Sequence, residues 1–186
     1  GHTIINDYGK FSLHLLPSGV FYPHITNIIG NGVAFDPDAF LRELNTLTSH
    51  GVPMPNILVS ERVQLLMPYH VLQDTYEEER LAGAAFGSTK SGIAPFYSDK
   101  YAKIGIQVNE LFDEKVLRER LNKVCTLKNV LFEHLYHKPK LNEDELFDHL
   151  MSWRDQLKPF LADTQRVASD ALAAGKTLLL EGQQGS

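Results

Sequence analysis

The chain has 186 residues, of which 43% are hydrophobic and 22% are charged. This composition is ordinary for a globular protein and excludes collagen-like and disordered chains. The formal charge is −5, which does not favour nucleic acid as a partner. The longest apolar runs are far shorter than the roughly 18 residues of a membrane-spanning helix, so no membrane partner is expected, and no secretory signal is visible. A lone cysteine, Cys125, indicates a reducing cytoplasm.

The amino-terminal residues are predicted to form a β-hairpin. Phe11, Leu13 and Leu15 alternate with polar residues, which is the period-2 pattern of a half-buried strand. Residues 7–9, Asp-Tyr-Gly, precede them and are typical of a turn. We therefore expect a hairpin over residues 3–15.

Two more strands and a helix are predicted before residue 60. Residues 25–29 and 57–59 are short β-rich runs. Between them, Asp36 stands at an N-cap position, Pro37 follows at the first helical position, and Gly51 lies just past the apolar pattern. These signals predict a helix between residues 36 and 51.

The middle of the chain is predicted to be helical. Asn142 is the expected cap of one of these helices, because acidic residues follow it in the first turn. After the last helix, residues 177–180 are apolar and are predicted to form a buried strand that runs into a loop, the place where open α/β sheets bind ligands. Apolar residues fall three and four apart over residues 68–81, 113–137, 142–160 and 164–174.

These elements predict an α/β fold with two parts. Residues 1–60 and 176–186 supply a partial sheet, and residues 61–175 form a helix-rich insertion. Only about four short strands are expected, whereas a buried strand usually has neighbours on both sides. We therefore expect the chain to be a fragment of a protein with a larger sheet.

Residues 87–92, Gly-Ser-Thr-Lys-Ser-Gly, are the stretch of the sequence with the most groups able to bind a ligand. Two glycines, three hydroxyls and a lysine could wrap a phosphate with amides, hydroxyls and an ammonium group. The spacing is not that of a P-loop, which requires G-x-x-x-x-G-K-[ST]. A solvated surface loop remains the alternative interpretation.

The histidines give weaker indications. His2, between Gly1 and Thr3, could approach a ligand closely, although Gly-His at an amino end is also typical of an expression tag. His134 and His137 lie three apart on a predicted helix but do not form an H-E-x-x-H metal site. A solvated helix face is the favoured interpretation of that pair.

Six short segments acquire meaning when they are taken together. They are GHT at 1–3, HLLPSG at 14–19, IGNGV at 29–33, GSTKSGIAP at 87–95, YSDK at 97–100 and LEGQQG at 180–185. Their order and approximate spacing resemble those of the adenylosuccinate synthetase family, and the resemblance covers the whole chain. One such segment would be weak, but six in register are specific.

The resemblance implies a fragment of a P-loop-NTPase-like mixed-sheet enzyme with a predominantly helical middle. The family consists of ligases that join IMP to L-aspartate at the expense of GTP, with Mg, in AMP biosynthesis and through 6-phosphoryl-IMP. The family's G-D-E-G-K-G-K loop and its guanine-binding part do not occur in the chain, so the fragment alone is expected to be inactive. The intact enzyme is expected to be a cytoplasmic homodimer.

The resemblance also assigns roles to individual residues. His2 matches the family's catalytic histidine, a proton donor that stabilises charge while a phosphoryl group moves. The backbone carbonyl of Gly1 matches a Mg ligand, and Gly1, His2 and Thr3 together match the segment that touches GTP and IMP. Ser88 and Thr89 match consecutive threonines near the IMP phosphate.

Two further matches concern the nucleotide. Gln184 matches a glutamine that hydrogen-bonds the nucleotide. Lys103 stands where many members place an arginine that reaches the IMP phosphate of the dimer partner. Because lysine keeps the charge but loses the bidentate fork, we expect that contact to be weaker. Residues 87–95 thereby become the expected loop for the IMP phosphate.

Two other hypotheses remain open at this point. Residues 61–175 could form a non-catalytic helical interaction domain in which the glycine loops are connectors. Alternatively, residues 87–92 could belong to a phosphate-binding regulatory module. The flanking coding sequence distinguishes the first hypothesis from the synthetase. Calorimetry with IMP on a Lys90→Ala variant distinguishes the phosphate-binding module from the helical interaction domain.

Overall fold

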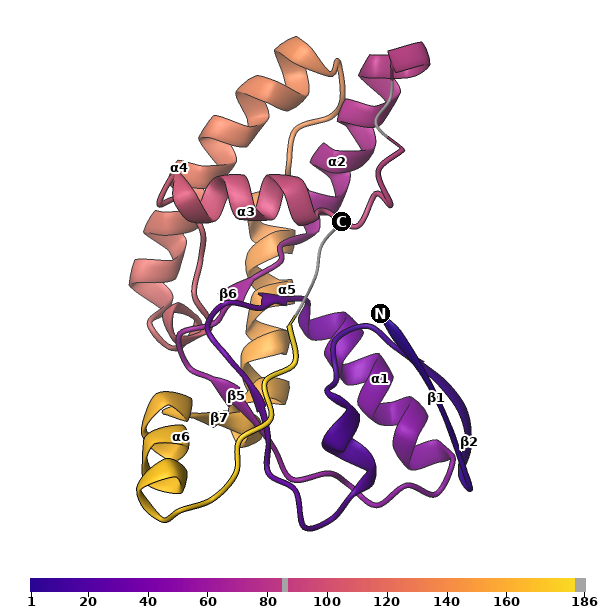
Figure 1. The fold of residues 1–186 in the computed structure, drawn as a ribbon. Helices are drawn as coiled ribbons and strands as arrows, with labels where there is room; N and C mark the ends of the chain where they lie inside the picture. Colours follow the sequence, from indigo (N-terminus) through magenta and orange to yellow (C-terminus); the bar gives the residue numbers. More distant parts are fainter. Residues whose placement is uncertain (85–86, 183–186) are drawn as a thin grey trace. The chain divides into compact units, whose positions relative to one another are not determined.

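The computed structural model describes residues 1–84 and 87–182, and the chain divides into two compact units. Unit 1 consists of Gly1–Val63 and Leu157–Ser186, and unit 2 of Gln64–Gln156. Figure 1 shows the helices and strands in chain colours.

Unit 1 begins with the predicted hairpin, which the structure confirms. Strand β1 (His2–Asn6) pairs antiparallel with β2 (Gly9–Leu13) across a two-residue turn. Gly9 leaves that turn with φ +132°, a conformation that favours glycine. Phe11 and Leu13 are buried, as the alternation predicts.

A three-stranded parallel sheet follows, in the order β3 (Asn27–Ile29), β5 (Ile57–Ser60) and β7 (Leu161–Ala162). Strands β3 and β5 confirm the two β-rich runs, although residues 25–26 remain outside β3. Val59, at the centre, pairs with Ile29 on one side and Leu161 on the other. The sequence does not predict β7, because two residues show no period.

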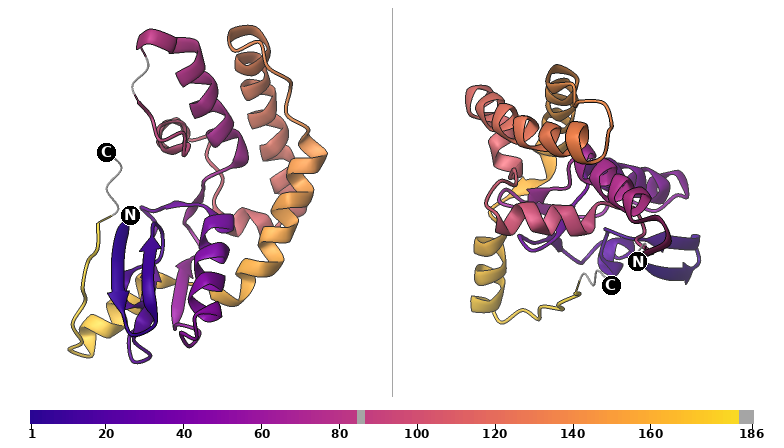
Figure 2. Two further views of the ribbon diagram at one scale, coloured as in Figure 1. Left: turned by 90° about the vertical axis from the view of Figure 1, so that its right-hand side faces the viewer. Right: turned by 90° about the horizontal axis from the view of Figure 1, so that it is seen from above.

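Helix α1 (Pro37–Ser49) begins as its cap predicts. The Asp36 carboxylate accepts the Ala39 amide at 3.1 Å, which satisfies one of the free amides of the first turn. One face of the helix is buried, and α1 lies beside the hairpin in Figures 1 and 2. The buried residues of that face are Phe40, Leu44 and Leu47.

Four other elements lie in the described part of unit 1. Helix α6 (Thr164–Ala173) confirms the predicted helix 164–174. A 3-10 turn (Ser18–Phe21) follows the hairpin, and a two-residue strand, β4 (Ala34–Phe35), precedes α1. Another 3-10 turn (Lys158–Phe160) leads into β7.

The strand predicted at residues 177–180 is wrong. No strand is assigned there, and Leu179 and Leu180 are 84% and 89% exposed. An apolar run fits the pattern of a buried strand, but such a strand also needs a paired neighbour. In the described part of the chain no strand pairs with this run. The apolar pattern alone does not tell whether a run has a pairing partner.

Unit 2 is helical, as predicted. Helix α2 (Pro68–Leu81) has the expected bounds, and α4 (Glu114–Val130) continues into a π-helical turn (Leu131–Leu135). Helix α5 (Glu143–Leu157) begins after Asn142, whose side chain accepts the Glu145 amide at 3.1 Å. Trp153 on this helix is 1% exposed, which confirms its predicted place in the core.

Helix α3 (Ile93–Tyr101) is not predicted from the sequence. Its nine residues are too few for a clear apolar period, and it includes Pro95. The other short elements of unit 2 are β6 (Gln64–Leu65) and 3-10 turns at Ala82–Ala84 and Val108–Phe112. Among residues 1–84 and 87–182, no helix is long and apolar enough to cross a membrane.

Candidate functional site

The predicted site residues of unit 1 lie at the start of the hairpin. Gly1 precedes β1, and His2 and Thr3 are its first residues. A Cβ on Gly1 would lie 2.6 Å from Cδ2 of His14 and 3.0 Å from the carbonyl oxygen of Leu13. A larger residue at this position would displace the exposed His14 side chain and crowd the Leu13 carbonyl of β2.

The His2 ring has an unpaired nitrogen. Its Nε2 is buried and has no hydrogen-bond partner within the described residues. A buried polar atom without a partner costs free energy comparable to a lost hydrogen bond. The atom is therefore available for a hydrogen bond with a water molecule or a ligand.

Glu43 on α1 anchors the residues that follow β2. Its carboxylate accepts the backbone amides of His14, Leu15 and Leu16 at 2.8 to 3.2 Å. These amides lie immediately after the strand that pairs with His2. The hairpin that carries His2 is therefore fixed to α1 at its open end.

Glu181, near the end of the described residues, also contacts this part of unit 1. The backbone amide of Ser18 donates to Oε2 of Glu181 at 3.1 Å, so Glu181 lies beside the segment that follows the hairpin. Gln184, the predicted nucleotide contact, lies outside the described residues.

A polar pair joins the carboxyl ends of two strands. Ser60, the buried last residue of β5, donates its hydroxyl to Oδ1 of Asn31, which follows β3. The same Ser60 oxygen accepts the Arg62 amide at 3.1 Å. The sequence does not single out Ser60, although its place at the end of a β-rich run is where α/β sheets bind ligands.

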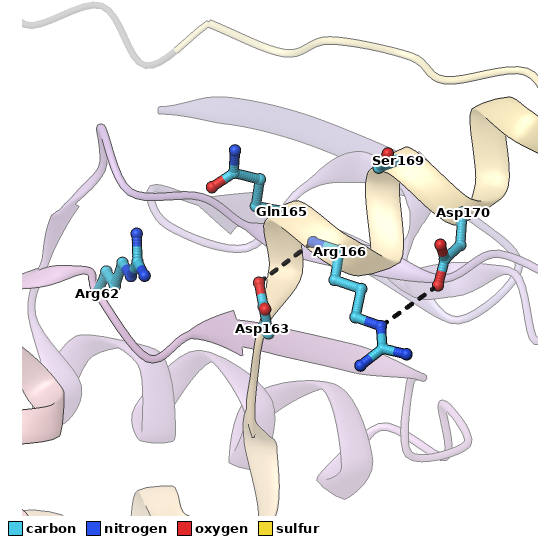
Figure 3. A pocket seen from close by; sticks show the side chains of 6 residues that line it. All are labelled: Arg62, Asp163, Gln165, Arg166, Ser169 and Asp170. Carbon is cyan, nitrogen blue, oxygen red and sulfur yellow. Dashed lines mark hydrogen bonds and ion pairs between the residues drawn. The ribbon is translucent and has the colours of Figure 1, made fainter.

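A polar pocket of about 290 Å³ lies beside the amino-terminal end of α6 (Figure 3). Asp163 caps this helix by accepting the Arg166 amide at 3.2 Å, and the Arg166 guanidinium lies 3.8 Å from the Asp170 carboxylate. None of the described predicted site residues lines this pocket. Its lining consists of Arg62, Asp163, Gln165, Arg166, Ser169 and Asp170.

In unit 2 the predicted site residues lie at opposite ends of α3. Ser88 and Thr89 precede the helix, and Lys103 follows it with φ +61°. A nine-residue helix is about 13 Å long. The structure therefore brings Ser88 and Thr89 together but keeps Lys103 a helix length away from them.

The three hydroxyls of the loop differ in their partners. Ser88 donates to Oδ1 of Asp74 at 2.8 Å and accepts the Lys90 amide at 3.1 Å. The hydroxyls of Thr89 and Ser91 lie 2.7 Å apart, and both residues are exposed. Ser88 is thus engaged by the protein itself, whereas Thr89 and Ser91 face outward.

A buried ionic network lies near the other end of α3. Asp99 accepts hydrogen bonds from Nε2 of His70 at 2.8 Å and from Nζ of Lys128 at 2.7 Å. Burial raises the pKa of Asp99, but these two hydrogen bonds outweigh burial and hold that pKa below its usual value. Burial lowers the pKa of His70, and its Nδ1 accepts the Met67 amide at 2.9 Å. His70 is therefore neutral, with its proton on Nε2.

The backbone of Asp99 supports the turn that carries Lys103. The Asp99 carbonyl accepts the amides of Ile104 at 3.0 Å and Gly105 at 3.2 Å. These bonds close the end of α3 around Lys103, as in other helix ends with a left-handed residue. The position of the Lys103 backbone thus depends on a residue whose carboxylate is held by His70 and Lys128.

No cluster of three or more histidine, cysteine, aspartate or glutamate side chains suited to a metal ion occurs in residues 1–84 and 87–182. The backbone carbonyl of Gly1 is a hard oxygen, which suits Mg²⁺. Mg²⁺ usually takes only one or two protein ligands and completes its shell with phosphates and water. Gly1 fits that description as a single ligand.

The parallel sheet of unit 1 and the helices of unit 2 define a mixed α/β protein, as predicted. A family model described as adenylosuccinate synthetase matches residues 1–186, and the chain belongs to that family. The predicted resemblance is confirmed over the whole chain.

Individual relatives agree with this assignment. Over its whole length the chain is 42% identical to adenylosuccinate synthetase of Dehalococcoides mccartyi and 40% identical to that of Streptococcus sanguinis, covering 44% and 43% of these proteins. A structure described as fully ligated adenylosuccinate synthetase from Plasmodium falciparum has a similar fold, with a TM-score of 0.78 and 24% identity. That likeness covers 95% of this chain and 41% of the other. The chain thus spans less than half the length of the curated relatives that it matches.

Proposed function

We propose that the protein carrying these residues is an adenylosuccinate synthetase, a ligase that makes adenylosuccinate from IMP and L-aspartate with GTP, in the cytoplasm. The observation that carries the proposal is the buried, unpaired Nε2 of His2, at the position of the family's catalytic histidine. The whole-chain family match supports it.

In the proposed reaction the γ-phosphoryl group of GTP moves to the 6-oxygen of IMP, which leaves GDP and 6-phosphoryl-IMP. The aspartate amine then attacks carbon 6 of this intermediate, and the bond between that carbon and the phosphorylated oxygen breaks, which releases phosphate. His2 donates a hydrogen bond toward the charge that develops during phosphoryl transfer, because this chemistry depends on positioning and on preorganised donors. Mg²⁺, when bound, would neutralise phosphate charge, and the Gly1 carbonyl would be its ligand from these residues.

The loop before α3 is proposed to bind the IMP phosphate. Thr89 and Ser91 expose their hydroxyls, and Lys90 between them carries a positive charge that favours an anion. Thr3 and Gln184 are proposed to contact the nucleotides. The Ser88 hydroxyl has partners within the protein, so we assign the phosphate contact to Thr89 before Ser88.

Lys103 is proposed to reach the IMP phosphate of a second subunit in a homodimer. Exposed apolar side chains on α4 support an interface in unit 2: Val116 is 40%, Leu127 48% and Val130 53% exposed. The 186 residues alone are proposed to be inactive, because they contain no G-D-E-G-K-G-K loop to position GTP and deprotonate IMP.

The test is a kinetic assay of the protein expressed from its complete reading frame. It should form adenylosuccinate and release phosphate only when GTP, IMP and L-aspartate are all present. His2→Asn should lower kcat by about a hundredfold or more, because a positioned proton donor is lost.

His24→Asn, at an exposed histidine of the same unit, is the matched control and should retain full kcat. Equal activity of the two variants would contradict the role of His2. An absence of product from the unsubstituted protein would contradict the proposed function itself.

A further inference from the structure

Asp74 is a buried carboxylate to which the proposed reaction gives no role. It lies on α2 and is 7% exposed. Its Oδ1 accepts the Ser88 hydroxyl at 2.8 Å, and its Oδ2 accepts the Gly92 amide at 2.8 Å. One side chain therefore holds both ends of the segment that contains Thr89 and Ser91.

Gly92 fixes the same segment against α2 by contact. It has φ +80°, and a Cβ there would lie 2.8 Å from the backbone carbon of His70 and from the backbone nitrogen of Val71. Backbone atoms of a helix cannot move aside as a flexible side chain can. The end of the loop thus lies against α2 where the Asp74 hydrogen bond also attaches it.

The hydrogen bonds of Ser88 extend the influence of Asp74 to Lys90. Ser88 donates to Asp74 and accepts the Lys90 amide at 3.1 Å. Lys90 has φ +54°, a conformation that costs free energy for any residue except glycine and persists only where its surroundings hold it. The Asp74–Ser88 pair supplies such a constraint, and hydrogen bonds to a carboxylate are stronger than neutral ones.

We propose that Asp74 is a positioning residue for phosphate binding. It holds residues 88–92 in the conformation in which the Thr89 and Ser91 hydroxyls lie 2.7 Å apart, where, with the Lys90 ammonium, they are proposed to bind the phosphate of IMP. This inference rests on the proposed function. We assign Asp74 no contact with the phosphate, because it is a buried anion and each of its oxygens already accepts a hydrogen bond from the loop.

The other end of α3 is attached separately. His70, one turn before Asp74 on α2, bonds to Asp99 near the carboxyl end of α3. Loss of Asp74 therefore leaves the Asp99 network, and the turn that carries Lys103, in place. The expected defect is confined to the loop before α3.

The test uses steady-state kinetics of the protein expressed from its complete reading frame. Asp74→Ala should raise the KM for IMP about tenfold or more, while the KM for GTP changes less than about twofold. Ser88→Ala should raise the KM for IMP by a smaller factor, because the Gly92 bond remains. Asp74→Asn keeps an acceptor for the Gly92 amide and should recover part of the loss.

Asp113→Ala is the matched control. This carboxylate also accepts a backbone amide, that of Val116 at 3.1 Å, at the start of α4 in the same unit. The variant loses an amide–carboxylate hydrogen bond at an exposed position away from the loop and should leave the KM for IMP unchanged.

An unchanged KM for IMP in Asp74→Ala, or an equal rise in the KM for GTP, would overturn the positioning role but leave the proposed function intact. Should Asp74→Ala not fold, Asp74→Asn and Ser88→Ala carry the test, and an unchanged KM for IMP in both overturns the role. If the unsubstituted protein makes no adenylosuccinate, the proposed function is wrong and the positioning role falls with it.

Discussion

At the scale of residues, His70 and Asp99 show how burial acts differently on two bonded groups. His70 is 1% exposed. Its uncharged ring accepts a hydrogen bond from the Met67 amide and donates one to Asp99. Asp99 keeps its charge because Lys128 lies 2.7 Å away. A buried ion pair gains strength from extra hydrogen bonds of this kind, and removal of one partner leaves an uncompensated charge.

The lowered pKa of His70 predicts a loss of stability in mild acid. The unfolded chain protonates this residue near the ordinary value of 6.5, whereas the folded protein does so at lower pH. Between the two values the unfolded state holds more protons, so the free energy of unfolding falls as the pH drops below 6.5. This group contributes at most about 1.4 kcal/mol per pH unit.

Asp99 acts in the same direction at lower pH. Its folded pKa lies below the ordinary 3.8, so its contribution is present above that value and is lost as the pH falls through the folded pKa. Urea unfolding of the chain between about pH 7 and pH 5 isolates the histidine. His70→Gln should show a shallower dependence than the unsubstituted chain, and identical slopes would contradict the assignment.

The sequence points to some residues of the candidate site but not to the residues that hold them. The loop 87–92 is visible because glycines, hydroxyls and a lysine are adjacent in sequence. Asp74 bonds to residues 14 and 18 positions away, and Asp99 to residues 29 positions away on either side. Contacts of that range come from helix packing, which one sequence does not reveal.

At the scale of elements, predictions succeed where capping and periodicity agree. Helices α1 and α5 have a capping side chain in the expected place, Asp36 and Asn142. Helix α3 lacks both signals, because Gly92 precedes it and offers no capping side chain. The apolar run at 177–180 shows the opposite failure, since its pattern is clear but no described strand pairs with it.

The cap of α1 leads to a stability prediction. Asp36→Ala removes the acceptor for the Ala39 amide and should lower the free energy of unfolding by about 1 kcal/mol. Asn45→Ala, at an exposed position within the same helix, should cost nothing, because alanine is the better helix former. Denaturant unfolding followed by circular dichroism measures both, and equal stabilities of the two variants would show that the cap contributes little.

At the scale of the whole molecule, composition and periodicity predict the α/β class, and the parallel sheet and helices of the structure confirm it. The two compact units are not visible as a shift in composition. The parallel sheet of unit 1 includes β7, a strand of two residues that follows a helical stretch and pairs with β5. No local feature of the sequence indicates that β7 pairs with β5, because the pairing joins residues about 100 positions apart.

The pairing of Val59 with Leu161 has a consequence for biosynthesis, because all of unit 2 lies between these residues. A nascent chain emerges from the ribosome amino end first, at about 5–20 residues per second. Unit 2 is continuous in sequence, so all of its residues have been synthesised before β7 is. The edge of β5 that pairs with β7 therefore stays without that partner while the whole of unit 2 is being translated.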